Sequence, residues 1–209
     1  MHKPFQYFVL NKPVGMESQF VSPFPGDLLG CLSYTFPEGT HAIGRLDKNS
    51  EGLLLLTTNK KITSLLFQSN VPHKRTYLVQ VKHKMGQESL QTLITGLDIR
   101  IKGGENYRTP PCEAKIVKYE ELKFHAHGRH KASLITTWLT ITLTEGKFHQ
   151  VRKMVLAAGH RCMRLIRISI EDMELGDLRP GEIRIVEQEQ FFRQLNLDTS
   201  SLISPSSPQ

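Results

Sequence analysis

Segments with the apolar pattern of β-strands dominate this sequence. Residues 74–82 alternate, with Tyr77, Val79 and Val81 on one face, and residues 134–144 are rich in β-branched side chains. Further strands are predicted at residues 5–10, 52–57, 112–119, 163–170 and 183–186, and helices at residues 60–69, 87–97 and 147–158. Because these strands do not alternate one for one with long crossover helices, we predict an α+β fold with a large mixed or antiparallel sheet flanked by helices and loops.

The ends of the chain and its cysteines narrow the class of protein. The 209 residues are enough for a sizeable core, and we predict one domain over residues 1–195, followed by a Ser/Pro-rich disordered tail over residues 196–209. The longest apolar runs are too short to span a bilayer, and the N-terminus lacks the long apolar stretch of a secretion signal. Three cysteines without CxxC spacing argue against a disulfide framework or a zinc site and fit a reducing cytoplasm. A glycine-rich phosphate loop, which would support a nucleotide cofactor, is not evident.

Positive charge is concentrated in one part of the chain. Residues 122–167 hold nine Lys and Arg against a single acid, a net charge of +8, whereas residues 168–209 carry a net charge of −5. A band this basic indicates a polyanionic partner, most commonly a nucleic acid. The alternative is a solvated basic surface. The band coincides with apolar-periodic segments rather than with a tail, which favours a binding face.

A polar loop leads directly into the predicted strand at residues 52–57. Asp47 lies in this loop, within the run GRLDKNSEG, and an acid beside such a strand could reach the floor of a cleft. There it could serve as a nucleophile or a base, held by its loop and by neighbouring cations. The alternative is an Asx-turn or cap, since Asp-Lys-Asn-Ser is typical of turns. Spacing alone favours the turn.

The predicted strand at residues 74–82 offers an aromatic side chain. Tyr77 shares its face with Val79 and Val81, so its ring should point inward. An ordinary core or edge tyrosine is one interpretation. The other is a stacking platform for a nucleobase, a task that aromatic faces perform with little sequence preference.

A basic segment opens the predicted helix at residues 147–158. Lys147 is oddly placed in the first turn of a helix, where the macrodipole is already positive, unless a buried carboxylate or a phosphate faces it. His149 and Arg152 share one exposed face that suits a phosphate backbone. The alternative is a solvated charged face on which Lys147 pairs with Glu145. The apolar stripe of this helix is predicted to be Phe148, Val151, Val155 and Ala158.

Histidines cluster in the polar segment at residues 125–131. His125, His127 and His130 have spacings that a metal site could use, but neither a carboxylate nor a thiol lies near them in the sequence. We therefore predict no metal site here, and expect a loop that contacts RNA or is simply solvated.

Taken together, the motifs resemble those of pseudouridine synthases of the RsuA/RluB/RluE/RluF branch. The matching segments are residues 7–15 (YFVLNKPVG), 44–47 (GRLD), 52–57 (GLLLLT), 74–79 (KRTYLV), 145–154 (EGKFHQVRKM), 164–168 (RLIRI) and 175–181 (LGDLRPG). They keep the same order and spread over most of residues 5–186, so the resemblance is specific. Longer members of this branch carry an N-terminal S4 RNA-binding module. Because the first motif starts almost at the N-terminus, we expect the chain to resemble the short E-type large-subunit enzymes that lack it.

The resemblance implies roles for individual residues. The aspartate of the GRLD motif, here Asp47, is the essential catalytic residue. Tyr77 lies against the target base, and Lys147 pairs with the aspartate. Arg45 fills the stack that the flipped base leaves. Together with Arg45, we expect RNA contacts from Lys12, His149, Arg152 and Lys153.

The resemblance also implies a fold and an activity. We expect a pseudouridine synthase catalytic fold with a central RNA-binding cleft, acting as a cytoplasmic monomer on RNA, and specifically on ribosomal large-subunit RNA. The reaction breaks the N1–C1′ bond of a uridine and forms a C5–C1′ bond, which requires the nucleotide to be flipped out of its helix. No metal and no cofactor are implied.

Two other function classes compete with this interpretation. A non-catalytic RNA-binding protein would use the basic face alone, but it would need neither Asp47 nor Tyr77 nor Lys147. A carboxylate-dependent glycosidase would need a second acid near Asp47, and Glu51 is the nearby candidate in sequence.

Overall fold

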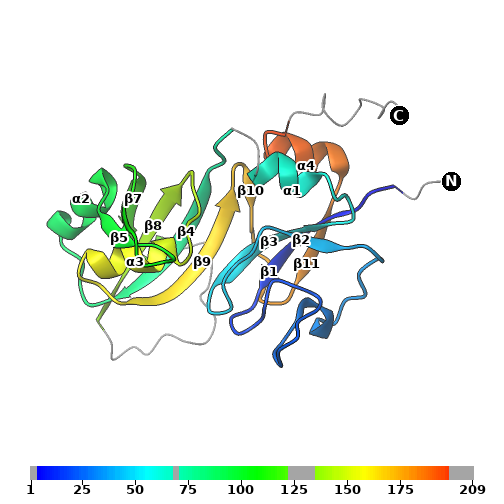
Figure 1. The fold of residues 1–209 in the computed structure, drawn as a ribbon, viewed down its shortest axis with the longest axis horizontal. Helices are drawn as coiled ribbons and strands as arrows, with labels where there is room; N and C mark the ends of the chain where they lie inside the picture. The colour runs from blue at the N-terminus through cyan, green and yellow to red at the C-terminus, as the bar shows by residue number, and fades with distance from the viewer. Residues whose placement is uncertain (1–3, 68–70, 122–134, 198–209) are drawn as a thin grey trace.

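The computed structural model describes residues 4–67, 71–121 and 135–197, and it is built around one large sheet (Figure 1). The strand order is β11-β1-β3-β9-β4-β8-β7, with β2 paired to β3 and β10 paired to β9. The strands are β1 (Tyr7–Lys12), β2 (His41–Ile43), β3 (Glu51–Thr57), β4 (Arg75–Lys82), β7 (Glu113–Val117), β8 (Thr136–Leu143), β9 (Cys162–Ile170), β10 (Met173–Glu174) and β11 (Ile183–Val186). A separate hairpin joins β5 (Asp98–Arg100) to β6 (Asn106–Arg108). The predicted α+β class with a large mixed sheet is confirmed.

Four helices accompany the sheet in the described ranges. They are α1 (Ile62–Phe67), α2 (Gln87–Thr95), α3 (Gln150–Ala157) and α4 (Gln188–Gln194), and two 3-10 turns cover Leu29–Cys31 and Tyr119–Glu121. Figure 1 shows α1 and α4 beside the part of the sheet that holds β1, β2, β3 and β11, and α2 and α3 beside β4, β7 and β8. None of these helices is long and apolar enough to cross a membrane.

Strand β3 is buried along its whole length because both of its faces are covered. Leu53 and Leu55 pack into the cluster that includes α1 and α4, whereas Leu54 and Leu56 pack on the opposite face against the segment that follows β1. The uninterrupted leucine run in the sequence therefore reflects a strand with two apolar environments rather than a helical stripe.

Strand β9 connects the two halves of the sheet. It pairs along its length with β4 in the antiparallel sense, and it meets β3 in a short parallel contact where Glu51 and Gly52 face Ile166 and Arg167. In Figure 1 it spans from the part with α2 and α3 to the part with β1, β3 and β11. This crossing brings the loop before β3 next to β4.

The close approach at this crossing requires a glycine. Gly52 has a φ of +98°, and a Cβ at this position would overlap the carbonyl oxygen of Arg167 and lie 2.8 Å from its backbone nitrogen. Glycine alone combines this backbone conformation with the absence of a side chain.

The structure corrects the predicted helix at residues 147–158. Helix α3 begins at Gln150, and the residue before it, His149, has a φ of +56°, which prevents the helix from extending towards Lys147. Phe148 was assigned to the apolar stripe, but it lies in the preceding turn with 57% of its side chain exposed. Val151 and Val155 are buried as predicted.

Several short elements were not predicted. They are β2, β5, β6, β10 and α4, of which α4 is anchored by the buried side chains of Phe191 and Phe192. Leu197, which was assigned to the tail, is buried in the same core cluster. Residues 198–209 lie outside the described residues, as do the histidine cluster at residues 125–131 and part of the basic band.

We expect Gly52→Ala to destabilise the fold by about 2–4 kcal/mol, because a non-glycine residue is strained at this φ and its Cβ would push against the backbone of β9. Urea unfolding followed by circular dichroism measures the loss. Gly30→Ala is the control, since a Cβ there has no heavy atom within 4 Å, and it should change stability by no more than about 0.5 kcal/mol. Equal effects of the two substitutions would contradict this account of the β3–β9 crossing.

Candidate active site

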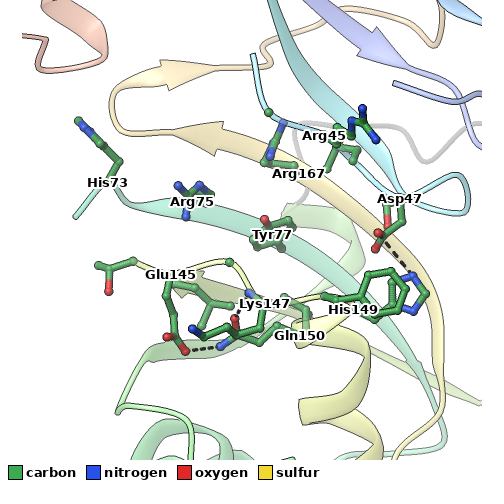
Figure 2. A pocket seen from close by; sticks show the side chains of 18 of the residues that line it. Arg45, Asp47, His73, Arg75, Tyr77, Glu145, Lys147, His149, Gln150 and Arg167 are labelled. Atoms are coloured by element: carbon green, nitrogen blue, oxygen red, sulfur yellow. Dashed lines mark hydrogen bonds and ion pairs between the residues drawn. The ribbon is translucent and has the colours of Figure 1, made fainter. Parts of the chain in front are cut away.

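A pocket of about 610 Å³ opens where the loop before β3, strands β4 and β9, and the turn before α3 meet (Figure 2). These segments lie far apart in the sequence. Among the residues that line the pocket are five of the predicted site residues: Arg45, Asp47, Tyr77, Lys147 and His149. The fold therefore brings most of the sequence candidates to one place.

The loop that carries Asp47 is held by backbone contacts. The buried Ser18 hydroxyl donates to the Leu46 carbonyl at 2.9 Å and accepts from the Leu46 amide at 3.0 Å. The Ser50 amide donates to the Asp47 carbonyl at 2.9 Å, which closes the turn into β3. The Asp47 side chain remains 32% exposed and faces the pocket. The turn-forming and the cleft-facing interpretations of Asp47 are thus compatible.

Lys12 supports this loop from inside the protein. Its side chain is fully buried, and its ammonium donates to the carbonyls of Met16 at 2.7 Å, Pro13 at 2.9 Å and Lys48 at 3.5 Å. Burial lowers the pKa of Lys12 to about 8, although the carboxylates of Glu51 and Asp47 act in the opposite direction. The predicted RNA contact of Lys12 is therefore wrong, because a buried ammonium with three protein acceptors cannot reach a phosphate.

Arg152 fastens α3 to the same loop. One nitrogen of its guanidinium, Nη2, donates to the Asn49 carbonyl at 2.6 Å and to the Ser50 hydroxyl at 3.5 Å. The other, Nη1, lies 3.6 Å from the Cys162 sulfur. The predicted face shared by His149 and Arg152 is not formed, since His149 precedes the helix and Arg152 is directed at the protein. Arg152 is better described as a clamp on the Asp47 loop than as a contact to RNA.

His149 is the side chain that approaches Asp47. Its Nε2 atom lies 3.4 Å from Oδ1 of Asp47, as the dashed line in Figure 2 shows. The left-handed backbone of His149 turns the imidazole towards the carboxylate. The ammonium of Lys147 lies instead over the ring of Tyr107, 5.1 Å from its centroid. The predicted ion pair of Lys147 with Asp47 is therefore wrong, although both side chains line the pocket.

A hydrogen-bonded network shapes the turn that holds Lys147. Glu145 accepts from the hydroxyl of Tyr107 and, at 2.5 Å, from the side-chain amide of Gln150. The carbonyl oxygen of that amide accepts from the Lys147 backbone at 2.8 Å. The bond to Glu145 raises the pKa of Tyr107 to about 12, because it stabilises the protonated phenol. This network replaces the predicted local pairing of Glu145 with Lys147. Tyr107 lies in the short strand β6, which the sequence pattern did not predict.

Tyr77 lies between two arginines at the base of the pocket. Arg75 is two residues earlier on β4, and Arg167 is opposite Tyr77 on β9 (Figure 2). Arg167 is buried, and its Nε donates to the Leu53 carbonyl at 2.8 Å. Burial lowers the pKa of both guanidinium groups, and the neighbouring Tyr77 hydroxyl opposes that effect. Sequence reasoning missed both arginines, although Arg167 belongs to the RLIRI motif.

The two remaining candidates are Arg45 and Lys153. Arg45 is exposed and lines the pocket beside Asp47. Lys153 is half-buried on α3, with its ammonium 5.4 Å from the centroid of the Phe148 ring. Both positions leave the cations within reach of a bound polyanion.

Glu51 does not provide a second catalytic acid. Both of its oxygens accept hydrogen bonds from the Arg164 guanidinium, at 2.9 and 2.7 Å, and both side chains are nearly buried. Both oxygens of this carboxylate are therefore engaged by one guanidinium group. Glu51 therefore does not supply the second carboxyl group that the glycosidase interpretation needs.

Comparisons with known proteins identify the family of the chain. The model of the RNA pseudouridylate synthase family matches residues 6–157. The chain is 33% identical to the ribosomal large subunit pseudouridine synthase E of Vibrio parahaemolyticus over 86% of its own length and 73% of that protein. It is 31% identical to the enzyme of the same name from Xanthomonas campestris, over 85% of this chain and 93% of that one. A crystal structure of a pseudouridylate synthase superposes with a TM-score of 0.74 at 26% identity, over 93% of this chain and 75% of the other.

The buried ammonium of Lys12 should make stability depend on pH. Its pKa in the folded protein, about 8, lies below the ordinary 10.5. Between these values the unfolded chain holds more protons on Lys12, so folding becomes more favourable as pH rises from 8 to 10.5 and less favourable as pH falls. The difference in unfolding free energy between wild type and Lys12→Met should shift in favour of wild type over this range. Lys60→Met, at an exposed position, should follow wild type at each pH, and a Lys12→Met difference that is constant with pH would refute the assignment.

The contact between His149 and Asp47 can be separated from Lys147 by double-mutant cycles. At low salt, the unfolding free energies of Asp47→Asn, His149→Gln and the double variant should show a coupling of up to about 1 kcal/mol, the range for a partly exposed pair. The cycle with Lys147→Met in place of His149→Gln should be additive. Coupling of Asp47 to Lys147 rather than to His149 would contradict the geometry described above.

Proposed function

The chain belongs to the RNA pseudouridylate synthase family and isomerises uridine in RNA to pseudouridine, and we propose that Asp47 is the carboxylate on which this reaction depends. The observation that carries the proposal is the convergence of Asp47, Tyr77 and Lys147 on one pocket from three segments far apart in the sequence. Two acidic side chains, Asp47 and Glu145, are among the residues that line this pocket. Glu145 is held by hydrogen bonds from Tyr107 and Gln150, whereas Asp47 makes neither of these bonds and its oxygens reach the cavity.

The reaction needs a nucleotide that is flipped out of its helix rather than a paired one. A uridine within a helix gives no access to its glycosidic bond, so it must be flipped into a recess, and the pocket volume falls in the range of about 300–1,000 Å³ typical of small-ligand sites. In our proposal Asp47 acts as nucleophile or base while the N1–C1′ bond is broken and the C5–C1′ bond is formed. Arg45, exposed beside Asp47, occupies the place that the flipped base vacates.

Tyr77 is proposed to lie against the uracil while it turns. Its ring is partly buried against two core clusters, so it is fixed in orientation, and it still contributes to the pocket lining. The guanidinium of Arg167 beside it adds positive potential at this end of the pocket. That potential favours a uracil ring that carries negative charge as its bond to the sugar breaks.

His149 and Lys147 are proposed to have separate tasks. His149, 3.4 Å from the Asp47 carboxylate, orients it within the pocket. Lys147, held over Tyr107, faces the same cavity and supplies positive charge to the nucleotide rather than to Asp47. Lys153 is proposed as a contact to the RNA backbone.

We propose ribosomal large-subunit RNA as the substrate, since relatives at 31–34% identity carry that specificity in their names. A cytoplasmic site of action is supported by the cysteines, because Cys31, Cys112 and Cys162 are all free. We also propose that the protein acts as a monomer.

Asp47→Asn tests the proposal, because it removes the charge of the carboxylate and keeps its shape. With a transcript of large-subunit ribosomal RNA as substrate, the variant should form pseudouridine about 10³-fold more slowly than wild type or not at all, while its affinity for the RNA changes little. Asp177→Asn, outside the pocket lining, is the matched control and should keep wild-type activity. Wild-type turnover by Asp47→Asn would overturn the assignment, and conversion of other RNAs but not of this transcript would overturn the proposed substrate.

A further inference from the structure

Phe148 is an aromatic side chain that lies outside the hydrophobic core. It lies in the turn before α3 and lines the pocket, yet 57% of it remains exposed. Exposure of a phenylalanine costs the free energy that burial would gain, so an exposed one beside a site for a ligand is a candidate for contact with that ligand. The reaction chemistry assigned to Asp47, Tyr77 and His149 does not require it.

Contacts through His149 hold the ring of Phe148 in a defined position relative to the Asp47 carboxylate. It stacks on the imidazole of His149 with centroids 3.8 Å apart and planes inclined by 19°. His149 in turn contacts Asp47 at 3.4 Å. Asp47, His149 and Phe148 therefore contact one another in a row and form one wall of the pocket, with the exposed ring of Phe148 at its end.

The turn beneath this wall is rigid. The Gln150 amide donates to the Lys147 carbonyl at 3.1 Å, and the Gln150 side chain accepts from the Lys147 amide at 2.8 Å. The left-handed backbone of His149 fixes the direction of its ring. An aromatic platform that is already ordered loses little conformational entropy when a ligand stacks on it.

The charges around the platform indicate the chemistry of its occupant. The Lys153 ammonium lies 5.4 Å from the ring centroid. An aromatic ring beside a cation is the combination by which proteins hold single-stranded nucleic acid: the ring stacks a base and the cation neutralises a phosphate. A protein partner would be expected to cover a wider apolar area.

We propose that Phe148 is the stacking platform for an unpaired base of the RNA next to the flipped uridine, with Lys153 moving from the ring to the phosphate of that nucleotide. This inference rests on the proposed function, because it takes the pocket of Asp47 as the place where the uridine lies. It implies that the enzyme selects a uridine whose neighbour is free to unstack. Stacking tolerates all four bases, so the platform reads the unpaired state of the neighbour rather than its identity.

The test uses a short single-stranded RNA with one uridine and 2-aminopurine next to it, whose fluorescence falls on stacking. Wild type should bind this RNA and quench the probe. Phe148→Ala should weaken binding by about 5- to 150-fold, the range for loss of one base–aromatic stack, and should abolish the quenching. Phe148→Tyr keeps a ring and should restore both. Phe24→Ala, at a position that is 73% exposed and outside the pocket lining, should behave as wild type.

Two further RNAs separate stacking from a change in pocket shape. Each carries an abasic residue in place of one neighbour of the uridine, on the 5′ side in the first RNA and on the 3′ side in the second. Wild type should lose affinity for one of the two abasic RNAs, and Phe148→Ala should bind that RNA no more weakly than wild type does. If Phe148→Ala weakens binding of the intact and the abasic RNAs equally, or leaves the quenching unchanged, the platform is refuted. These readouts are equilibrium binding, so they are independent of whether Asp47→Asn abolishes turnover, and the two proposals can fail separately.

Discussion

The close contact between β3 and β9 is the constraint on which the rest of the structure depends. Gly52 allows the two backbones to meet where any side chain would collide with Arg167. This meeting joins the half of the sheet that holds β1 and β11 to the half that holds β4 and β8. It also sets the loop of Asp47 on one side of the crossing and Tyr77 on the other. A wider separation of β3 and β9 would pull apart the two walls of the pocket.

Buried and partly buried cations hold the pocket together by donating to backbone carbonyls. Lys12 donates to three carbonyls around the Asp47 loop, Arg152 donates to Asn49, and Arg167 donates to Leu53. Each of these cations fixes the loop or a strand that lines the site. The desolvation cost is visible in Lys12, whose pKa falls to about 8, and it is offset in part by the carboxylates of Asp47 and Glu51. Positive charge in this protein is therefore divided between an inner set that builds the site and an outer set that we propose for contact with RNA.

The turn before α3 decides which side chain serves which task. Because His149 adopts a left-handed conformation, its imidazole faces Asp47 and its ring supports Phe148. Lys147 is directed instead towards Tyr107, where Glu145 and Gln150 complete a network. One backbone conformation thus orients both the Asp47 carboxylate, which we propose to be the reactive group, and the proposed platform for a neighbouring base.

The sequence by itself determined the α+β class, the main strands and helices, and the set of segments that form the pocket. Apolar periodicity depends on neighbours along the chain, and motifs such as GRLD are local, so both can be read without a fold. Only the tertiary structure decided that Lys12 is buried, that Arg152 holds the Asp47 loop, and that His149 rather than Lys147 faces Asp47. The direction of a long cationic side chain depends on which carbonyls and carboxylates the fold brings within reach. Those acceptors come from residues distant in sequence, such as Asn49 for Arg152. The positive φ of His149 likewise depends on the folded turn, and it directs His149 rather than Lys147 to Asp47.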